Sequence, residues 1–177
     1  MTKINNVDVD NLQAFEALWR KDPSASRKTQ VIEGEWIVEE GNVQFQSTVR
    51  FEGGETVLRV DNPTFMGGGG HQPGPMHYCF FGLASCYTGT FATMAAMLGI
   101  ELKKLTVRVE AAVNFLKVFG LSDDPTMEEV RVKLHVVSDA PQDQIKQAEE
   151  LALQRCPVVY TLRNPVRLVP EITISHS

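Results

Sequence analysis

The sequence predicts an α+β fold in one main domain, and three observations support this class. Residues 29–60 alternate between apolar and polar side chains, which is typical of antiparallel strands. Residues 76–99 are almost continuously apolar, which is typical of a buried helix. Two further alternating stretches, 102–115 and 127–137, precede an amphipathic helical pattern. Because strands and helices do not alternate one by one, we expect antiparallel β-meanders with a long central buried helix, and not a doubly wound sheet.

The first 26 residues are expected to form an N-terminal helical extension, and residues 27–177 the main domain. The chain has 177 residues, a length that suits one domain with a small appendage. Within the extension, residues 10–21 have the spacing of an amphipathic helix, which Asp22 and Pro23 end. Its apolar side chains share one face: Leu12, Phe15, Leu18 and Trp19.

The main domain is expected to begin with a three-stranded meander. Residues 31–38 and 43–51 alternate and are joined by a turn at 40–42. A second hairpin turn at 52–55 leads to a strand at 56–60. Short turns of this kind join antiparallel strands, so we expect these strands to form one sheet.

Four consecutive glycines lie in a loop that runs from Met66 to Pro75. A phosphate-binding loop would also contain a lysine followed by a hydroxyl residue, and both are missing here. Nucleotide binding is therefore not expected. We interpret the loop as a flexible rim beside a site.

The apolar stretch is expected to form a helix over residues 75–97 or 75–98. Proline suits the first position, because the N–H that it lacks has no helical partner there, and Gly99 suits the C-terminal cap. Gly82 and Gly89 lie inside the helix, where each costs about 1 kcal/mol, so they indicate a close neighbour such as a second helix or a ligand. A helix that is apolar on all sides needs cover on all sides, so we expect a homodimer.

The second half of the chain is expected to add strands at 102–115 and 127–137 and a helix at 141–155. A short helix would begin at Cys156 and Pro157, and a strand at 166–174 would close the chain.

The composition excludes several classes of function. The net charge is −5 and no basic run occurs, so nucleic acid is not an expected partner. The first residues lack a signal-peptide core, and polar side chains interrupt the longest apolar stretch, so we expect no membrane segment and a cytoplasmic location. In that reducing compartment the three cysteines do not predict a structural disulfide framework; a disulfide would be catalytic or regulatory.

Cys86 and Cys156 are the candidate reactive groups. Cys86 lies beside small residues in the apolar helix, either as an ordinary buried side chain or as a thiol that meets a small molecule. Cys156 precedes Pro157, which indicates the N-cap of a helix, where free N–H groups favour the thiolate; a buried turn cysteine is the alternative. Cys79 is seven residues from Cys86, about 10.5 Å along a helix, which is too far for a disulfide.

A zinc site is not expected. The available ligands are His71, His77, Cys79 and Cys86. His77 and Cys79 would point about 200° apart around a helix, and no second closely spaced ligand pair supports them. We therefore expect no metal and no cofactor.

Two motifs and their order resemble the OsmC/Ohr family. Residues 75–86, PMHYCFFGLASC, are similar to the family helix that runs from a proline through an apolar, alanine-containing segment to a cysteine. The later segment 148–158, AEELALQRCPV, is similar to a second family motif, and residues 61–63 with the glycine-rich loop are similar to a third. The resemblance covers roughly residues 30–175, so residues 27–177 are identified as the OsmC-like domain.

The resemblance implies an intertwined homodimer in which the cysteine-bearing central helices of two chains pack together. It also implies a thiol peroxidase of the organic hydroperoxide reductase type, with a role in the oxidative stress response. Cys86 would be the peroxidatic thiolate that becomes a sulfenic acid, and Cys156 the resolving thiol that condenses with it to a disulfide. A small dithiol similar to dihydrolipoamide would restore both thiols.

One position departs from the family pattern. The family's hydroperoxide reductases place a glutamate directly after the proline, and here that residue is Met76. The carboxylate normally pairs with an arginine that activates the thiolate. Arg27 and Arg50 are the candidates for this arginine, and we assign Arg27 because it is nearer the expected place.

The missing glutamate leaves two other functions open. The first is a non-enzymatic OsmC-like protein that senses oxidants or binds a small apolar ligand. Its motivation is a helix rich in aromatic residues: Tyr78, Phe80, Phe81, Tyr87 and Phe91. The second is an inert structural dimer, in which neither cysteine reacts faster than a free thiol.

Overall fold

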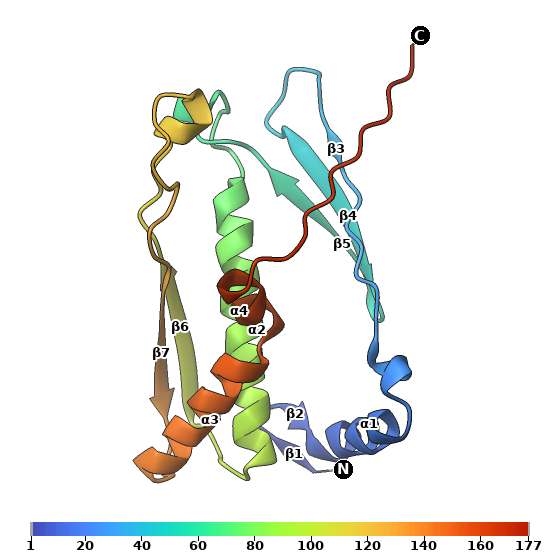
Figure 1. The fold of residues 1–177 in the computed structure, drawn as a ribbon, viewed down its shortest axis with the longest axis vertical. Coiled ribbons are helices and arrows are strands. Elements are labelled where there is room, and N and C mark those ends of the chain that lie inside the picture. The colour runs from blue at the N-terminus through green and yellow to red at the C-terminus, as the bar shows by residue number, and fades with distance from the viewer. Residues whose placement is uncertain (1, 177) are drawn as a thin grey trace.

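The structure, a computed structural model, describes residues 2–176. Three small antiparallel sheets and three shorter α-helices surround one long helix, α2 (Pro75–Met97) (Figure 1). This arrangement confirms the predicted α+β class with its β-meanders and central helix. No helix of residues 2–176 is both long enough and apolar enough to cross a membrane.

Helix α2 has the bounds that its local signals predict. Pro75 occupies its first turn behind the N-cap Gly74, and the helix ends at the C-cap Leu98. Gly99 follows with a φ of +73°, a left-handed conformation that favours glycine. One face of the helix carries the large buried side chains of the core, among them Phe91, which is 1% exposed.

The N-terminal segment forms a short hairpin and a helix. Strands β1 (Lys3–Ile4) and β2 (Val7–Asp8) pair with each other, and α1 (Val9–Lys21) and the 3₁₀ helix η1 (Pro23–Ser26) follow. The hairpin was not predicted, although Asn5 and Asn6, which take positive φ angles in its turn, are typical of such turns. The Asn5 side chain fixes this segment to the main domain, since it donates to the Ile100 carbonyl at 2.8 Å and accepts from the Leu102 N–H at 2.8 Å.

The first half of the main domain forms the expected three-stranded meander. Its strands are β3 (Glu35–Trp36), β4 (Phe45–Phe51) and β5 (Gly54–Val60), in the order β3-β4-β5. The pairing of β4 with β5 is antiparallel, and Ser47 lies opposite Leu58. The strand expected at 31–38 is shorter than predicted.

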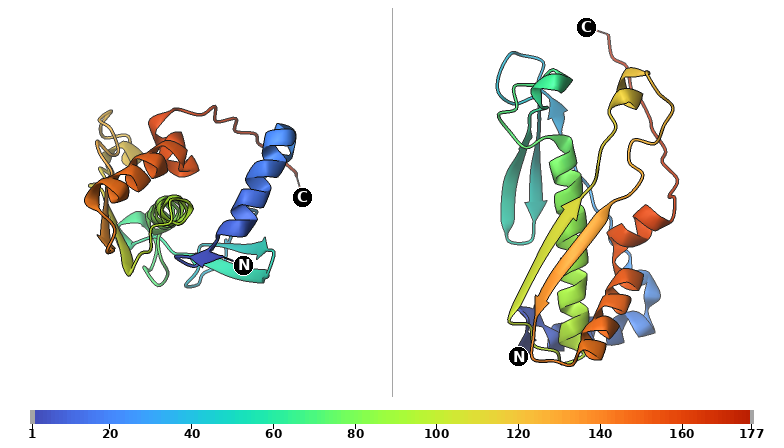
Figure 2. Two further views of the ribbon diagram at one scale, coloured as in Figure 1. Left: turned by 90° about the horizontal axis from the view of Figure 1, so that it is seen from below. Right: turned by 90° about the vertical axis from the view of Figure 1, so that its left-hand side faces the viewer.

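In the second half of the main domain, two strands and two helices pack against α2 and form the core with it. Strands β6 (Lys104–Glu110) and β7 (Arg131–Val137) pair antiparallel, and α3 (Gln142–Arg155) and α4 (Pro157–Arg163) follow. The buried cluster joins α2, α3 and α4 and has nine members: Leu83, Tyr87, Phe91, Ala95, Ile100, Ala148, Ala152, Cys156 and Val159. Helices α3 and α4 and the β6–β7 sheet lie along one side of α2, while the β3–β5 sheet and α1 lie elsewhere around it (Figure 2).

The strand predicted at residues 166–174 is not formed. This segment is extended, but it belongs to no sheet, and it runs away from α4 toward the C-terminus (Figure 1). Its apolar side chains are exposed, with Leu168 at 88%. An alternating pattern needs a neighbouring strand with free backbone groups, and the single chain brings none beside this segment.

The glycine-rich loop, which we interpret as a flexible rim, is attached to the end of β5 by hydrogen bonds to one buried carboxylate. The Asp61 side chain, which is 1% exposed, accepts the N–H groups of His71 at 2.8 Å and Gly69 at 3.1 Å. The hydrogen bond from His71 and then that from Gly69 lower the pKa of Asp61, although burial opposes the shift. A side chain at Gly68 would overlap the backbone of Asn62, so the close approach of the loop to this strand end requires glycine.

Candidate active site

The structure brings Cys86 and Cys156 together. Cys86 lies near the middle of α2, and Cys156 lies at the junction of α3 and α4. The Cys156 thiol donates to the Cys86 sulfur, with the two Sγ atoms 3.4 Å apart. Both are free thiols, Cys156 buried and Cys86 half-buried. The sulfurs are in contact, so a disulfide needs them to move closer by about 1.4 Å.

Local sequence accounts for the position of Cys156. It is the C-cap of α3 and the N-cap of α4, where its N–H donates to the Ala152 carbonyl at 2.9 Å and Pro157 follows in the first turn. Ala148 and Ala152 are fully buried on the face of α3 that belongs to the core. Small side chains at these positions let α3 approach α2 closely enough for the sulfurs to touch.

The electrostatic surroundings of Cys86 contain opposing effects. Burial raises the pKa of the Cys86 thiol, and the neighbouring Cys156 adds to the rise. The backbone N–H of Val158, in the first turn of α4, acts in the other direction because it stabilises the thiolate. The sequence suggested that free N–H groups at the start of a helix favour the thiolate of Cys156. In the structure such an N–H group favours the thiolate of Cys86 instead. Nothing in the pattern around Cys86 indicates this amide, because Val158 comes 72 residues later in the chain.

Tyr87 is a neighbour of the thiols that the sequence motifs do not mark as part of the site. It is buried in the same cluster as Cys156. Burial, and then the nearby carboxylate of Glu149, raise the pKa of Tyr87 to about 12. Its phenol therefore stays protonated beside the thiol pair at neutral pH.

The proposed arginine does not meet the thiols within the single chain. Arg27 is exposed at the C-terminal end of η1, and it is not among the groups that set the pKa of Cys86. Arg50, the other candidate, pairs with Glu55 at 3.4 Å across the β4–β5 hairpin. Cys79 is exposed on α2. Among residues 2–176, no group of three or more His, Cys, Asp or Glu side chains is arranged to hold a metal ion.

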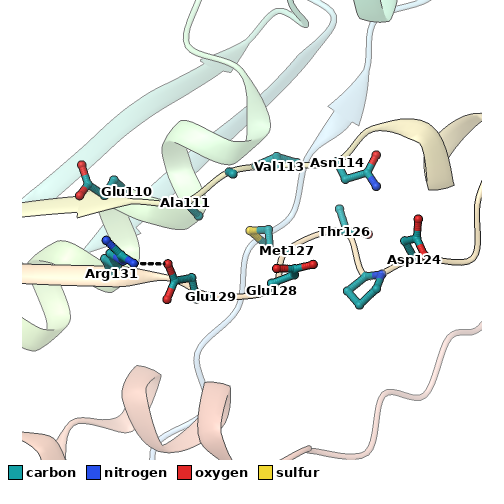
Figure 3. A pocket seen from close by; sticks show the side chains of 12 residues that line it. Glu110, Ala111, Val113, Asn114, Asp124, Thr126, Met127, Glu128, Glu129 and Arg131 are labelled. Carbon is teal, nitrogen blue, oxygen red and sulfur yellow. Dashed lines mark ion pairs between the residues drawn. The ribbon is translucent and has the colours of Figure 1, made fainter.

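A separate hollow of about 930 Å³ lies between the segment that follows β6 and the segment that precedes β7 (Figure 3). Side chains of both segments line it, and neither Cys86 nor Cys156 is among them. Glu129 and Arg131 pair at its edge with a distance of 2.7 Å. Its other carboxylates come from Glu110, Asp124 and Glu128, and so acidic a lining does not suit a site for an apolar substrate.

Comparisons with known proteins agree with this architecture. The family model described as OsmC-like protein matches residues 67–171, which is more than half of the chain. No curated protein matches the sequence.

Several solved structures are similar to the chain. A crystal structure of an OsmC-like protein from Mycoplasma pneumoniae has a TM-score of 0.56 and 21% identity, and covers 78% of this chain and 89% of that one. An organic hydroperoxide resistance protein OsmC from Legionella pneumophila has a TM-score of 0.53 and 17% identity, with coverage of 77% and 92%. An organic hydroperoxide resistance protein from Elizabethkingia anophelis has a TM-score of 0.52 and 16% identity, with coverage of 78% and 92%.

At these sequence identities, similarity to the solved structures shows only a shared fold. The match to the family model shows membership of the family. The residues that match the family model include both cysteines of the thiol pair, Cys86 and Cys156. The chain belongs to the OsmC-like protein family.

Proposed function

We propose that this protein is a thiol-dependent reductase of organic hydroperoxides, with Cys86 as the peroxidatic and Cys156 as the resolving cysteine. The observation that carries the proposal is the 3.4 Å distance between their sulfurs. A peroxidatic cysteine must be accessible, and its partner must reach the sulfenic acid before further oxidation does. Cys86 is half-buried and Cys156 fully buried, which fits this division of roles.

The reaction balances with two electrons from a dithiol. The Cys86 thiolate attacks the distal oxygen of the hydroperoxide, the O–O bond breaks, and the alkoxide takes a proton and leaves as the alcohol. The Cys156 thiolate then attacks the sulfenic sulfur of Cys86, a disulfide forms, and the hydroxyl group leaves as water. A small dithiol reduces the disulfide by two exchange steps and is itself oxidised. The names of two similar structures, both organic hydroperoxide resistance proteins, support this substrate class.

We also propose an intertwined homodimer. The side of α2 that the single chain leaves open carries Phe81, which is 70% exposed. A Cβ added to Gly82 or Gly89 would meet nothing within 4 Å, although glycines inside a helix are expected where a neighbour approaches closely. A second α2 against this side would provide that neighbour, and the extended residues 166–174 supply a strand for pairing between chains.

The dimer also gives Arg27 a role. Since Arg27 does not set the pKa of Cys86 in its own chain, we propose that it acts across the dimer interface and stabilises the thiolate there. The thiol pair itself is built entirely from residues 27–177, which supports our division into an N-terminal extension at 1–26 and an OsmC-like domain.

A steady-state assay with cumene hydroperoxide and dihydrolipoamide tests the proposal. Replacing the nucleophile in Cys86→Ser is expected to lower turnover at least about a thousandfold, because a serine hydroxyl forms no comparable nucleophile at neutral pH. Cys79→Ser is the matched control, since it removes an exposed thiol from the same helix, and it is expected to keep full activity. Equal turnover by the wild type and Cys86→Ser would overturn the proposal.

A further inference from the structure

A second cavity, of about 530 Å³, lies between the start of β7 and the two helices α3 and α4. Helix α2 contributes Leu83 and Tyr87 to its walls, and neither cysteine of the thiol pair lines it. These two residues belong to the side of α2 that packs into the core, and not to the side that carries the exposed Phe81. Residues 127–129 line both this cavity and the hollow of Figure 3, so the two are neighbours. The cavity is therefore distinct from the thiol pair and lies away from the proposed contact between two α2 helices.

The walls of the cavity are largely apolar and are supplied by the core. Leu83 and Val159 are 4% and 9% exposed and belong to the buried cluster. Val130, just before β7, and Val132, within it, pack against the same cluster. A volume between about 300 and 1,000 Å³, with apolar walls and few polar groups, is typical of sites for small molecules. Because packed core residues form these walls, a ligand does not have to order them when it binds.

The hydroxyl of Tyr87 is the buried polar group of these walls. The residue is 4% exposed, and its hydroxyl forms no hydrogen bond with any of residues 2–176. Among the residues of this range that are not exposed, only Thr88 has a fully buried side-chain O or N atom without a partner, so the Tyr87 oxygen has access to the cavity that the residue lines. The hydroxyl of a buried tyrosine usually has a hydrogen-bonding partner. It is therefore available to a polar group of a molecule that enters the cavity.

The charged groups around the cavity favour a cation. Glu128 and Glu149 line it and form no ion pair with a described residue, whereas Arg163 is the only basic side chain among the described lining residues. A third carboxylate, that of Glu129, is paired with Arg131 at 2.7 Å. Burial raises the pKa of the phenol, and Glu149 lies close enough to add to this rise. A positive group beside the phenol would be stabilised by Glu149, whereas a negative group there would be repelled.

We propose that this cavity is a non-covalent binding site for a small amphipathic cation, an alkylammonium or arylalkylammonium molecule. Its apolar part packs against Leu83, Val132 and Val159. Its ammonium group donates to the Tyr87 oxygen, with the Glu149 carboxylate as the counter-ion. The site works independently of the thiol pair, so it is a function in addition to the proposed peroxidase activity.

Isothermal titration of the whole, reduced protein with 3-phenylpropylammonium chloride tests the proposal. Saturable binding is expected, and amide chemical shifts measured in parallel should change most at Val130, Val132 and Leu162. The anion 3-phenylpropionate has the same ring and a chain of similar length. It is expected to bind at least about tenfold more weakly, because Glu149 repels its carboxylate.

Two variants test the contacts of the ammonium group. Tyr87→Phe keeps the ring and removes the oxygen that accepts the hydrogen bond, so the cation is expected to bind about tenfold more weakly. Glu149→Gln removes the charge and keeps the size, and is expected to weaken binding at least about threefold. This variant is expected to fold, because Glu149 is exposed. Glu150→Gln is the matched control: Glu150 is exposed on the same helix and does not line the cavity, so the affinity should stay unchanged.

The variant Cys86→Ser separates this proposal from the proposed peroxidase function. It is expected to bind 3-phenylpropylammonium as the wild type does, even though it cannot reduce a hydroperoxide, and a loss of binding would contradict the independence of the site. The proposal would be overturned if the wild type showed no saturable binding, or if the anion bound as tightly as the cation. Wild-type affinity in both Tyr87→Phe and Glu149→Gln, or shifts that centre on Phe81, would overturn it as well.

Discussion

The two sides of α2 differ in how completely the single chain covers them. On one side Leu83, Tyr87 and Phe91 are buried in the core that α3 and α4 share, and this side brings Cys156 to Cys86. On the other side Phe81 is exposed and Gly89 has open space beside it. One chain therefore suffices to bring the two thiols into contact. The surroundings that would activate Cys86 are not complete in that chain, because burial raises its pKa and Arg27 is not among the groups that set it.

The largest expected effect concerns stability on the covered side. Phe91→Ala removes a ring that is 1% exposed, and is expected to lower the free energy of unfolding by about 3–5 kcal/mol. Phe81→Ala, on the open side of the same helix, is expected to cost about 1 kcal/mol or less at protein concentrations where the chain is a monomer, because Phe81 is 70% exposed there. Urea unfolding of the two variants over a series of protein concentrations measures the difference, and equal losses at the lowest concentration would show that the single chain covers both sides alike.

The next effect concerns association on the open side. Gly89→Leu adds a side chain where the single chain has room, so its secondary structure is expected to stay intact. If a second α2 packs there, the added side chain prevents close approach and weakens dimerisation at least about tenfold. Sedimentation velocity across a concentration series measures this. If the wild type sediments as a monomer at every concentration, the proposal that a second α2 packs against the open side is contradicted.

The smallest expected effect is the pH dependence of stability on the covered side. The native pKa values of Cys86 and Tyr87 are raised, that of Tyr87 to about 12 from 10.0, so the unfolded chain ionises these groups first as the pH rises. Their contribution to stability is complete below about pH 9 and is lost as the pH rises through the native values. For Tyr87 the loss is about 1 kcal/mol at pH 11.

Urea unfolding at several pH values between 8 and 11 detects this loss. Tyr87→Phe is the control, because it removes the phenol and keeps the ring. A slope with pH that is the same in Tyr87→Phe and the wild type would contradict the assignment to this residue.

The parts of the fold that depend on local chemistry could be predicted from the sequence. Pro75 and Gly99 mark the ends of α2, and Pro157 marks the start of α4, because each signal acts within a few residues of its own position. The strand at 166–174 could not be judged in this way. Alternation identifies the faces of a strand, and it does not say whether another strand lies beside it.

The candidate site, too, could be predicted from the sequence only where local signals mark its residues. Cys86 and Cys156 could be selected from their motifs, whereas the Val158 amide that stabilises the thiolate depends on how α4 is oriented toward α2. No local pattern in the sequence predicts this contact, because tertiary packing brings α4 against α2.

The most direct test of the central claim is the product of stoichiometric oxidation. The reduced protein is mixed with one equivalent of cumene hydroperoxide, and its mass and disulfide map are then determined. We predict a loss of about two daltons and a bond between Cys86 and Cys156, which also forms in Cys79→Ser. In Cys156→Ser a sulfenic acid should instead accumulate on Cys86, where it can be trapped with dimedone. Overoxidation of Cys86 while Cys156 stays reduced, or no oxidation of either thiol, would contradict the claim that the two form a redox centre.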